Sequence, residues 1–403
     1  MKQVNLPIAI DEMDALLAAE QMESSFSVIF NAERAQNVWS TPLGEAALAQ
    51  WVITHWRKNL ARVAFSIDGT GSDIERLGKV SQTLPGAVLA LLPNGRIQDT
   101  SRSASASFRE KFFRNQDKWP DLVNFESAFL LCLDSYSGGL PHQLYVGEQE
   151  KAVVNWDSFR VLIDQLIKSV ARDEDVRGNL IGNLGRISTI FLELFKNTHD
   201  HARKGIAGET LGDSVRSIHA HFYPMDSLKG FIVTKAKEEC NQVELYVRNL
   251  ATENPKVAVR GQKARDVAGL LELSVLDSGP GLAAKWLGVD VSNHDVATQM
   301  TAVMECFRKG ASTIPGGGRG YGLWKVLQEI KSLKGFIRVR TNNVHAIRQF
   351  GSIENLNLER DKDGVTRPKE VLYDWRRGFS AKLDKYPSAE GTLISILLPV
   401  GTI

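Results

Sequence analysis

The spacing of apolar side chains along the chain predicts a series of helices and strands. Residues 155–170 and 180–199 repeat apolar positions every three or four residues, which is typical of helices that bury one face. Residues 271–277 alternate apolar and polar positions and end in turn residues, which indicates a strand. The same criteria predict a helix at 296–308, strands at 217–223, 231–235, 243–248, 335–340, 371–375 and 391–399, polar connections at 172–179 and 249–268, and a hairpin or loop at 357–369.

The first 150 residues show a shorter alternation of strand and helix patterns. Strands that alternate with helices predict a small α/β domain. We further expect a flexible loop at 101–107, an amphipathic surface helix at 108–119 and a connection at 141–154. The strands of the predicted domain are at 25–31, 62–67 and 87–92, and its helices are at 45–58 and 73–83.

At 403 residues the chain is long enough for two domains, which we place at 1–150 and 151–403. Its net charge of +2 gives no electrostatic indication of a nucleic-acid or membrane partner. No apolar run reaches 18 residues, and acidic residues interrupt the apolar N-terminus, so we expect neither a transmembrane helix nor a signal peptide. Three dispersed cysteines favour a reducing compartment over a disulfide framework or a zinc site. We therefore expect a cytoplasmic protein.

Glu193 and Asn197 are candidates for chemistry because they lie four residues apart in the second predicted helix and so share one helix face. Asp200 stays near that face. An amide oxygen can ligate a hard cation such as Mg²⁺, and a carboxylate one turn away can orient or deprotonate a water. Polar residues at this spacing are more often a solvated helix face, so this stretch alone does not indicate a site.

Three further motifs follow in order. Asp277 ends a predicted strand and is followed by Gly279 and Gly281, so its carboxylate can accept a hydrogen bond from an adenine amino group while the backbone approaches the base. A glycine-rich loop then leads into a helix that begins near Tyr321, which presents backbone N–H groups to phosphates. Thr392, in the last strand, has a hydroxyl that can reach the same ligand. The loop glycines are Gly316, Gly317, Gly318, Gly320 and Gly322.

In this order the motifs resemble the sequence boxes of the GHKL ATPases, which share the Bergerat fold and include type II topoisomerases and sensor histidine kinases. Residues 193–197 resemble the N box, 277–281 the G1 box, 318–323 the G2 box and 391–392 the last box. The resemblance implies an α/β fold for 151–403, an α+β two-layer sandwich around ATP and Mg²⁺, beside the smaller N-terminal α/β domain.

The resemblance also implies roles for single residues. Asp277 would bind the adenine amino group, Asn197 would bind Mg²⁺, and Glu193 would orient the attacking water. Lys309 and Arg319 would reach the γ-phosphate from a lid at 281–320. The implied nucleotide-binding residues are Asn197, Asp200, Asp277, Gly279, Gly281, Lys309, Gly316, Gly317, Gly318, Arg319, Gly320, Tyr321, Gly322, Leu323 and Thr392.

Three functions stay open. The first is an ATP-hydrolysing switch whose lid closure creates a contact with a protein partner or a second copy, since a Glu at position 193 accompanies hydrolysis in the family. The second is a histidine- or serine-directed protein kinase that acts in trans, because no His lies between His142 and His199 to serve as the usual phosphoacceptor. The third is a nucleotide-binding scaffold without turnover. The N-terminal domain is faintly similar to STAS-type domains, which implies sensing or partner binding.

Two pairs of histidines have alternative interpretations. His219 and His221 share one side of the strand at 217–223, so a zinc pair is possible, but we expect an exposed strand face because no third ligand is evident. His199 and His201 do not share a helix face, and we expect them at the mouth of the pocket or in solvent.

Overall fold

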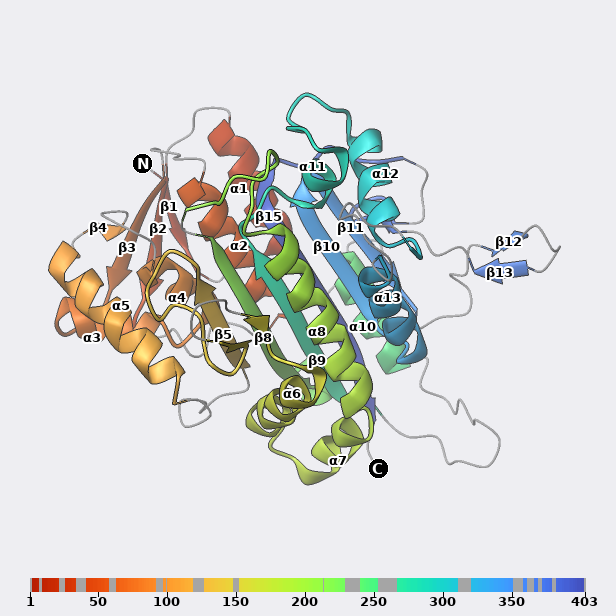
Figure 1. The fold of residues 1–403 in the computed structure, drawn as a ribbon, viewed down its shortest axis with the longest axis horizontal. Helices are drawn as coiled ribbons and strands as arrows, with labels where there is room; N and C mark the ends of the chain where they lie inside the picture. The colour runs from red at the N-terminus through yellow and green to blue at the C-terminus, as the bar shows by residue number, and fades with distance from the viewer. Residues whose placement is uncertain are drawn as a thin grey trace.

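A seven-stranded antiparallel sheet runs through the centre of the computed structural model (Figure 1). Its strands lie in the order β14-β11-β10-β15-β9-β8-β5. They are β5 (Ser127–Leu133), β8 (Val215–Pro224), β9 (Val267–Asp277), β10 (Phe336–Asn342), β11 (Val344–Gln349), β14 (Tyr373–Asp374) and β15 (Ala389–Gly401). The structure describes residues 2–6, 9–21, 26–33, 41–57, 63–91, 97–98, 100–118, 127–147, 152–212, 214–228, 240–252, 267–310, 320–350, 358–360, 366–368, 372–378 and 382–401.

One face of this sheet is covered by helices that lie between residues 156 and 332 (Figure 1). Because side chains alternate along a strand, Leu271, Leu273 and Val275 of β9 all point to this face and pack in one core with Phe191 and Phe195. The helices predicted at 155–170, 180–199 and 296–308 are confirmed, the second with a later start. The helices on this side are α6 (Trp156–Val170), α7 (Glu174–Gly182), α8 (Leu184–His201), α11 (Leu282–Leu287), α12 (Val296–Cys306) and α13 (Gly322–Ser332).

The opposite face is covered largely by residues from the first half of the chain. Leu276 of β9 and Leu393 of β15 point to this side and share a core with Leu48 and Val52. The strand β5 also precedes residue 150 and pairs with β8 at the edge of the sheet. The sheet therefore draws on residues from both sides of position 150. The helices of this layer are α1 (Ile10–Gln21), α2 (Gly44–Arg57) and α10 (Gln242–Thr252).

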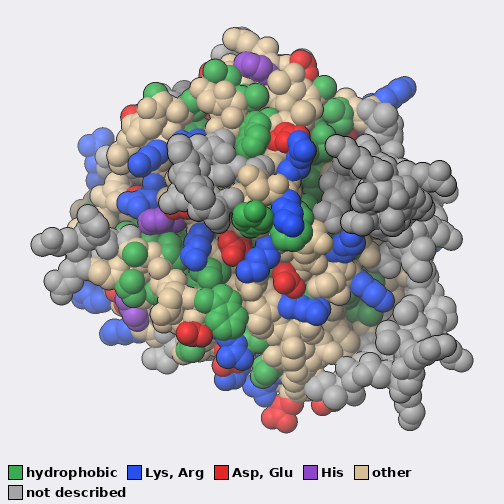
Figure 2. All heavy atoms as spheres, turned by 45° about the vertical axis from the view of Figure 1, so that its right-hand side comes forward, with side chains coloured by type: hydrophobic (Ala, Val, Ile, Leu, Met, Phe, Trp, Pro, Cys, Tyr) green, Lys and Arg blue, Asp and Glu red, His purple; other side chains and the backbone are tan. Residues whose placement is uncertain are grey.

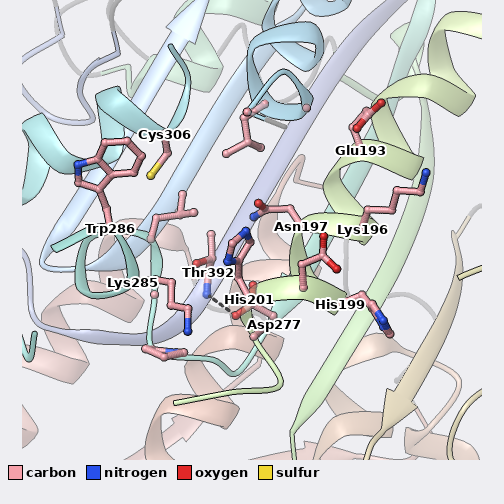
Figure 3. Close-up of a pocket in the computed structure, with 18 of the residues that line it drawn as sticks. Glu193, Lys196, Asn197, His199, His201, Asp277, Lys285, Trp286, Cys306 and Thr392 are labelled. Carbon is pink, nitrogen blue, oxygen red and sulfur yellow. Dashed lines mark hydrogen bonds between the residues drawn. The ribbon is translucent and has the colours of Figure 1, made fainter. Parts of the chain in front are cut away.

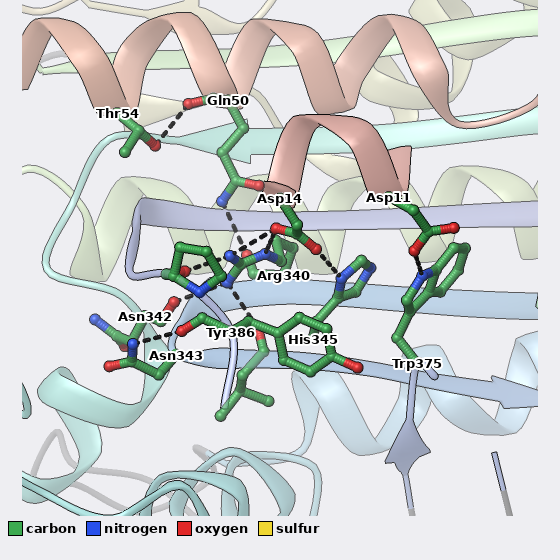
Figure 4. Close-up of polar contacts among 12 residues, drawn as sticks. Asp11, Asp14, Gln50, Thr54, Arg340, Asn342, Asn343, His345, Trp375 and Tyr386 are labelled. Carbon is green, nitrogen blue, oxygen red and sulfur yellow. Dashed lines mark hydrogen bonds and ion pairs between the residues drawn. The ribbon is translucent and has the colours of Figure 1, made fainter. Parts of the chain in front are cut away.

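Buried polar groups hold α1 against the sheet (Figure 4). Asp14 accepts a hydrogen bond from Arg340 Nη2 at 3.0 Å, and its other oxygen lies 3.0 Å from His345 Nδ1. Burial lowers the pKa of His345 to about 3, and the Arg338 guanidinium acts in the same direction, so His345 is neutral. A neutral His345 can accept the hydrogen bond that Arg338 Nε donates to its Nε2 at 2.7 Å.

A second, parallel sheet of four strands lies beside the first one in Figure 1. The strands predicted at 25–31 and 62–67 and the helices predicted at 45–58 and 73–83 are confirmed. The protein is thus of mixed α/β class, with several sheets. The parallel sheet consists of β1 (Lys2–Asn5), β2 (Phe26–Asn31), β3 (Val63–Asp68) and β4 (Ile97–Gln98). Two helices lie between β3 and β4 in the chain, α3 (Asp73–Val80) and α4 (Leu84–Leu91), and α5 (Arg102–Gln116) follows β4. Two short hairpins pair β6 (Tyr145–Val146) with β7 (Ala152–Val153) and β12 (Leu358–Arg360) with β13 (Thr366–Pro368).

Two predictions failed because apolar runs are ambiguous. The strand predicted at 87–92 is wrong, because its residues belong to α4, which is buried along its whole length and so shows no polar face. The strand predicted at 243–248 is also wrong, because these residues lie in α10. Val243, Tyr246 and Val247 are buried there at helical spacing. The strand predicted at 231–235 lies outside the described residues.

Two further predictions failed because the residue types that cap helices are also common in loops. Residues predicted as a flexible loop at 101–107 begin α5, where the Ser101 side chain accepts a hydrogen bond from Ala104 N at 3.2 Å. Residues predicted as a turn at 172–179 largely belong to α7, where the Asp173 side chain accepts from the N–H groups of Asp175 and Val176. Small polar and acidic residues at these positions cap a helix.

Gln50 ties α2 to the two strands beside it, and its removal has a measurable expected cost. Its Nε2 donates to the carbonyl of Arg340 at 2.9 Å (Figure 4). It also donates to the carbonyl of Glu390 at 3.2 Å. Gln50→Ala leaves both carbonyls without this donor, so we expect the free energy of unfolding to fall by about 2 kcal/mol in urea titrations. Gln143→Ala is the matched control, since Gln143 Nε2 also bonds two carbonyls but in a peripheral loop. An equal loss in both variants would contradict this role of Gln50.

Candidate functional site

A row of polar side chains crosses one end of the seven-stranded sheet. Asp277 of β9 is paired in register with Arg216 of β8 on one side and with Thr392 of β15 on the other, and Thr392 is paired with Thr341 of β10. Asp277 continues the alternation of Leu271, Leu273 and Val275, so it points to the face that carries α8. Because of this alternation, the row of polar side chains faces α8, the helix that carries the polar residues of the N box.

Asp277 and Thr392 of this row line one pocket of about 660 Å³ between α8 and the sheet. In the close-up of Figure 3, Asn197, His201, Asp277 and Thr392 gather at the centre, and Glu193 lies toward one side. The volume lies within the usual range for sites that bind small molecules and cofactors. The described residues that line the pocket are Ala152, Val153, Glu193, Lys196, Asn197, His199, Asp200, His201, Ala202, Asp277, Pro280, Gly281, Leu282, Lys285, Trp286, Cys306, Gly320, Tyr321, Gly322, Leu323, Lys325 and Thr392.

Asp277 is held in place by two backbone donors. Its Oδ1 accepts hydrogen bonds from Gly279 N at 2.9 Å and Thr392 N at 3.2 Å. Among the described residues Oδ2 makes no hydrogen bond, so it can accept one from a ligand. Burial raises the pKa of Asp277 from 3.8 to about 6, although both backbone donors act in the opposite direction. Near neutral pH the site therefore holds an ionised, buried acceptor.

Two glycines allow the backbone to pass close to Asp277. Gly391 has φ +65°, and a Cβ there would lie 1.8 Å from the carbonyl oxygen of Asp277. A Cβ on Gly279 would lie 2.6 Å from Cα of Ala202, which follows α8. Gly279 therefore permits close packing between the strand end and α8, and it is absent from the residues that line the pocket.

The predicted lid is only partly described. The backbone N–H of Gly310 donates to the carbonyl of Gly320 at 2.9 Å, so the two ends of the intervening segment meet. The predicted ligands Gly316, Gly317, Gly318 and Arg319 lie outside the described residues. Lys309 is described, but its ammonium lies over the ring of Trp324, 5.2 Å from the centroid, and it does not line the pocket.

The first turn of α13 meets Glu193. Tyr321 caps this helix, and Gly322 and Leu323 begin it beside the pocket. A Cβ on Gly322 would lie 3.1 Å from Glu193 Oε2, so the carboxylate packs directly against the start of the helix. Lys325 Nζ lies 3.5 Å from Glu193 Oε1.

Several cations and an aromatic residue of the pocket were missed by the sequence analysis. Lys285 lines one side and donates to the carbonyl of Gly205 at 3.1 Å, and Trp286 lies next to it (Figure 3). Lys325 lies three residues after the last loop glycine, a spacing that puts it in the first turn of α13 and that could have indicated it. His199 and His201 line the pocket, as one of the two interpretations expected.

A network of buried polar side chains packs against the residues that line the pocket. Arg216 is fully buried, donates from Nε to Asp134 Oδ2 at 3.1 Å and also donates to the Tyr145 hydroxyl. That hydroxyl lies 3.3 Å from His199 Nδ1. Burial lowers the pKa of His199, and the nearby Arg216 guanidinium adds to this effect. The network therefore connects β8 to the last turn of α8, where Asp200 and His201 face the pocket.

No family model, curated protein or solved structure matches this chain. None of the helices in the described ranges combines the length and hydrophobicity needed to cross a bilayer. Basic and acidic side chains are interspersed on the face seen in Figure 2, in agreement with a net charge of +2. The function must therefore be inferred from the pocket and its residues.

The raised pKa of Asp277 predicts a stability effect whose sign depends on pH. Above about pH 6 the carboxylate is charged in both the folded and unfolded chain, and its burial costs the folded state roughly 3 kcal/mol. Between pH 6 and 3.8 the folded chain binds the proton first, so this cost shrinks as the pH falls. Asp277→Asn removes the charge and keeps an acceptor for both N–H groups, so we expect it to be more stable than the parent at pH 8. By pH 5 we expect about half of that difference, measured by urea unfolding. A difference that does not change with pH would contradict the assignment.

Proposed function

We propose that this chain binds ATP with Mg²⁺ in the pocket between α8 and the sheet, as a GHKL-type protein with a Bergerat fold, and hydrolyses it. One observation carries the proposal: residues from positions 193, 197, 277, 320–323 and 392 line the same pocket. Each of the four motifs contributes at least one of these residues. An antiparallel sheet with α6, α8 and α13 on one face supports the two-layer sandwich.

The residues present fit the chemistry of a nucleotide. The free Oδ2 of Asp277 would accept a hydrogen bond from the adenine amino group. The backbone at Gly320 and Gly322, beside the start of α13, would offer N–H groups and the positive end of a helix to the phosphates. Lys285 and Lys325 add positive charge on two sides of the pocket.

The donor set also fits Mg²⁺, which binds proteins through one or two oxygen ligands and otherwise through water and phosphates. Asn197 would hold the ion, and the ion would neutralise charge on the phosphates. Glu193 would orient the attacking water beside the first turn of α13. Positioning and electrostatic stabilisation of this kind are what phosphoryl transfer mainly requires.

A contact within the predicted lid at 281–320 supports the proposed switch function. The backbone N–H of Gly310 donates to the carbonyl of Gly320, which lines the pocket, so phosphates bound there would lie next to this contact. We infer that closure over ATP changes a surface that a protein partner or a second copy contacts.

The test is to incubate the full chain with γ-labelled ATP, with and without Mg²⁺. Release of label as inorganic phosphate that requires Mg²⁺ supports hydrolysis. Transfer of label to this chain or to an added polypeptide would replace hydrolysis with the kinase function. Tight binding of ATP without either product would leave a nucleotide-binding scaffold. Calorimetry that detects no binding of ATP or ADP would overturn the whole proposal.

A further inference from the structure

A second cluster of chemically active side chains lies on the face of the sheet opposite the pocket. Glu45 comes from α2, and His219 and His221 come from β8, and all three are buried. The expectation of an exposed strand face for the two histidines is therefore wrong, because α2 covers that face. The third ligand that the sequence did not reveal is Glu45, which lies 174 residues before His219.

We propose that Glu45, His219 and His221 bind one divalent metal ion of the zinc class, which joins α2 to β8. The three ligand atoms all lie within 4.8 Å of one another. Glu45 Oε2 lies 3.1 Å from His219 Nε2 and 3.7 Å from His221 Nδ1. Tetrahedral zinc with bonds of about 2.0–2.1 Å separates its ligand atoms by about 3.3–3.5 Å, so these two separations are close to those of a zinc site.

The surroundings of His219 match those of a metal-bound imidazole. Its Nδ1 lies 3.6 Å from Glu272 Oε1, so a carboxylate stands behind the ring and can orient Nε2 toward the ion. Glu272 is itself anchored, because its Oε2 accepts from Leu43 N at 2.8 Å and from the Tyr223 hydroxyl at 2.9 Å. The Ser127 hydroxyl lies 3.1 Å from both Glu45 Oε2 and His219 Nε2, and so borders the same space.

A proton on His219 does not account for the whole cluster. Although burial opposes it, the Glu45 carboxylate, together with Glu272, raises the pKa of His219 to about 10, so an ion pair explains that ring. It accounts only in part for His221, whose buried Nδ1 lies within ion-pair distance of Glu45 Oε2 at 3.7 Å but makes no hydrogen bond within the described residues. A buried acceptor or donor without a partner costs about 1–3 kcal/mol. A metal ion would use this nitrogen as a ligand.

The burial of the cluster favours a structural role. Two imidazoles and one carboxylate suit zinc and related first-row ions. The three ligand residues are buried, which is typical of a closed structural site. The ion would hold α2 against the sheet on the side away from the pocket, so its loss is separable from the loss of ATP binding.

The experiment measures metal content and uptake by the full chain. The untagged protein is analysed by elemental mass spectrometry, stripped with a chelator and titrated with Zn²⁺. Circular dichroism checks the fold of the variants His221→Gln, Glu45→Gln and Glu272→Gln, with the exposed His142→Gln as control. We expect about one ion per chain in the parent and in His142→Gln, and no stoichiometric binding in the first two variants. Glu272→Gln should weaken binding by roughly 10- to 100-fold.

The outcomes separate the metal site from the ion pair. No saturable uptake of Zn²⁺ by the stripped parent would overturn the proposal, as would binding in His221→Gln equal to that of the parent. If the variants do not fold, the test is the visible absorption spectrum of the stripped parent after addition of Co²⁺. Tetrahedral Co²⁺ bound to nitrogen and oxygen absorbs visible light strongly. Absence of that spectrum would also overturn the site.

Discussion

Glu193→Gln should lower the rate of phosphate release from ATP by a factor of about 100 to 10,000 while leaving nucleotide affinity within a few-fold of the parent. The carboxylate of Glu193 packs against the start of α13 beside Lys325, at the side of the pocket where the phosphates would lie. Glutamine keeps the size of this side chain and removes its capacity to orient and deprotonate a water. A loss in turnover without a loss in binding is the signature of an interaction made in the transition state.

The measurement pairs steady-state phosphate release with calorimetry of a non-hydrolysable ATP analogue. Glu329→Gln is the matched control, because Glu329 also lies on the α8–α13 side but pairs with Arg186 at 3.7 Å and does not line the pocket. We expect the control to turn over like the parent. Retention of more than half of the parent rate by Glu193→Gln would remove this residue from the catalytic role.

Asp277→Asn should weaken ATP binding by roughly 10- to 100-fold, or about 1.4–2.7 kcal/mol. In the parent, Oδ1 accepts from two backbone donors, and Oδ2 makes no hydrogen bond to any residue that the structure describes. If Asn keeps its oxygen toward those donors, its NH₂ group faces the adenine amino group, and two donors meet. The same variant is expected to be the more stable protein at pH 8, so weak binding would not reflect unfolding.

Purine riboside triphosphate, which lacks the 6-amino group, isolates this contact. The parent should bind it more weakly than ATP, because Asp277 then has no donor to accept from. Asp277→Asn should bind the two nucleotides with similar affinity. Equal binding of both nucleotides by the parent would show that Asp277 does not read the amino group, even if ATP itself binds.

Local patterns were sufficient to predict the polar row beside the pocket. Asp277 ends an alternating strand and is an even number of residues from Leu271 and Val275, so it points to the same face of the sheet as they do. Asn197 and Glu193 follow from helical periodicity in the same way. Arg216 escaped notice because it lies just before the predicted strand at 217–223, and its partner Asp134 is remote in sequence.

Contacts between distant parts of the chain could not be predicted. Nothing in the sequence near His219 indicates that Glu45 packs against it, because that contact depends on the position of α2 across the sheet. The same limit applies to α4, whose apolar run fits a buried strand as well as a buried helix. Local periodicity indicates which face of a helix or strand is buried, but it does not indicate which other element covers that face.

The place of β5 at the edge of the large sheet has a consequence for any fragment of this protein. A piece that starts at residue 151 would lack β5, so the backbone groups of β8 that pair with it would become an open edge. It would also lack α1 and α2. Without these helices, the buried side chains of Arg340, His345 and Glu272 would be exposed to water or to other chains. Such a fragment should aggregate, and its failure to bind nucleotide would say nothing about the pocket.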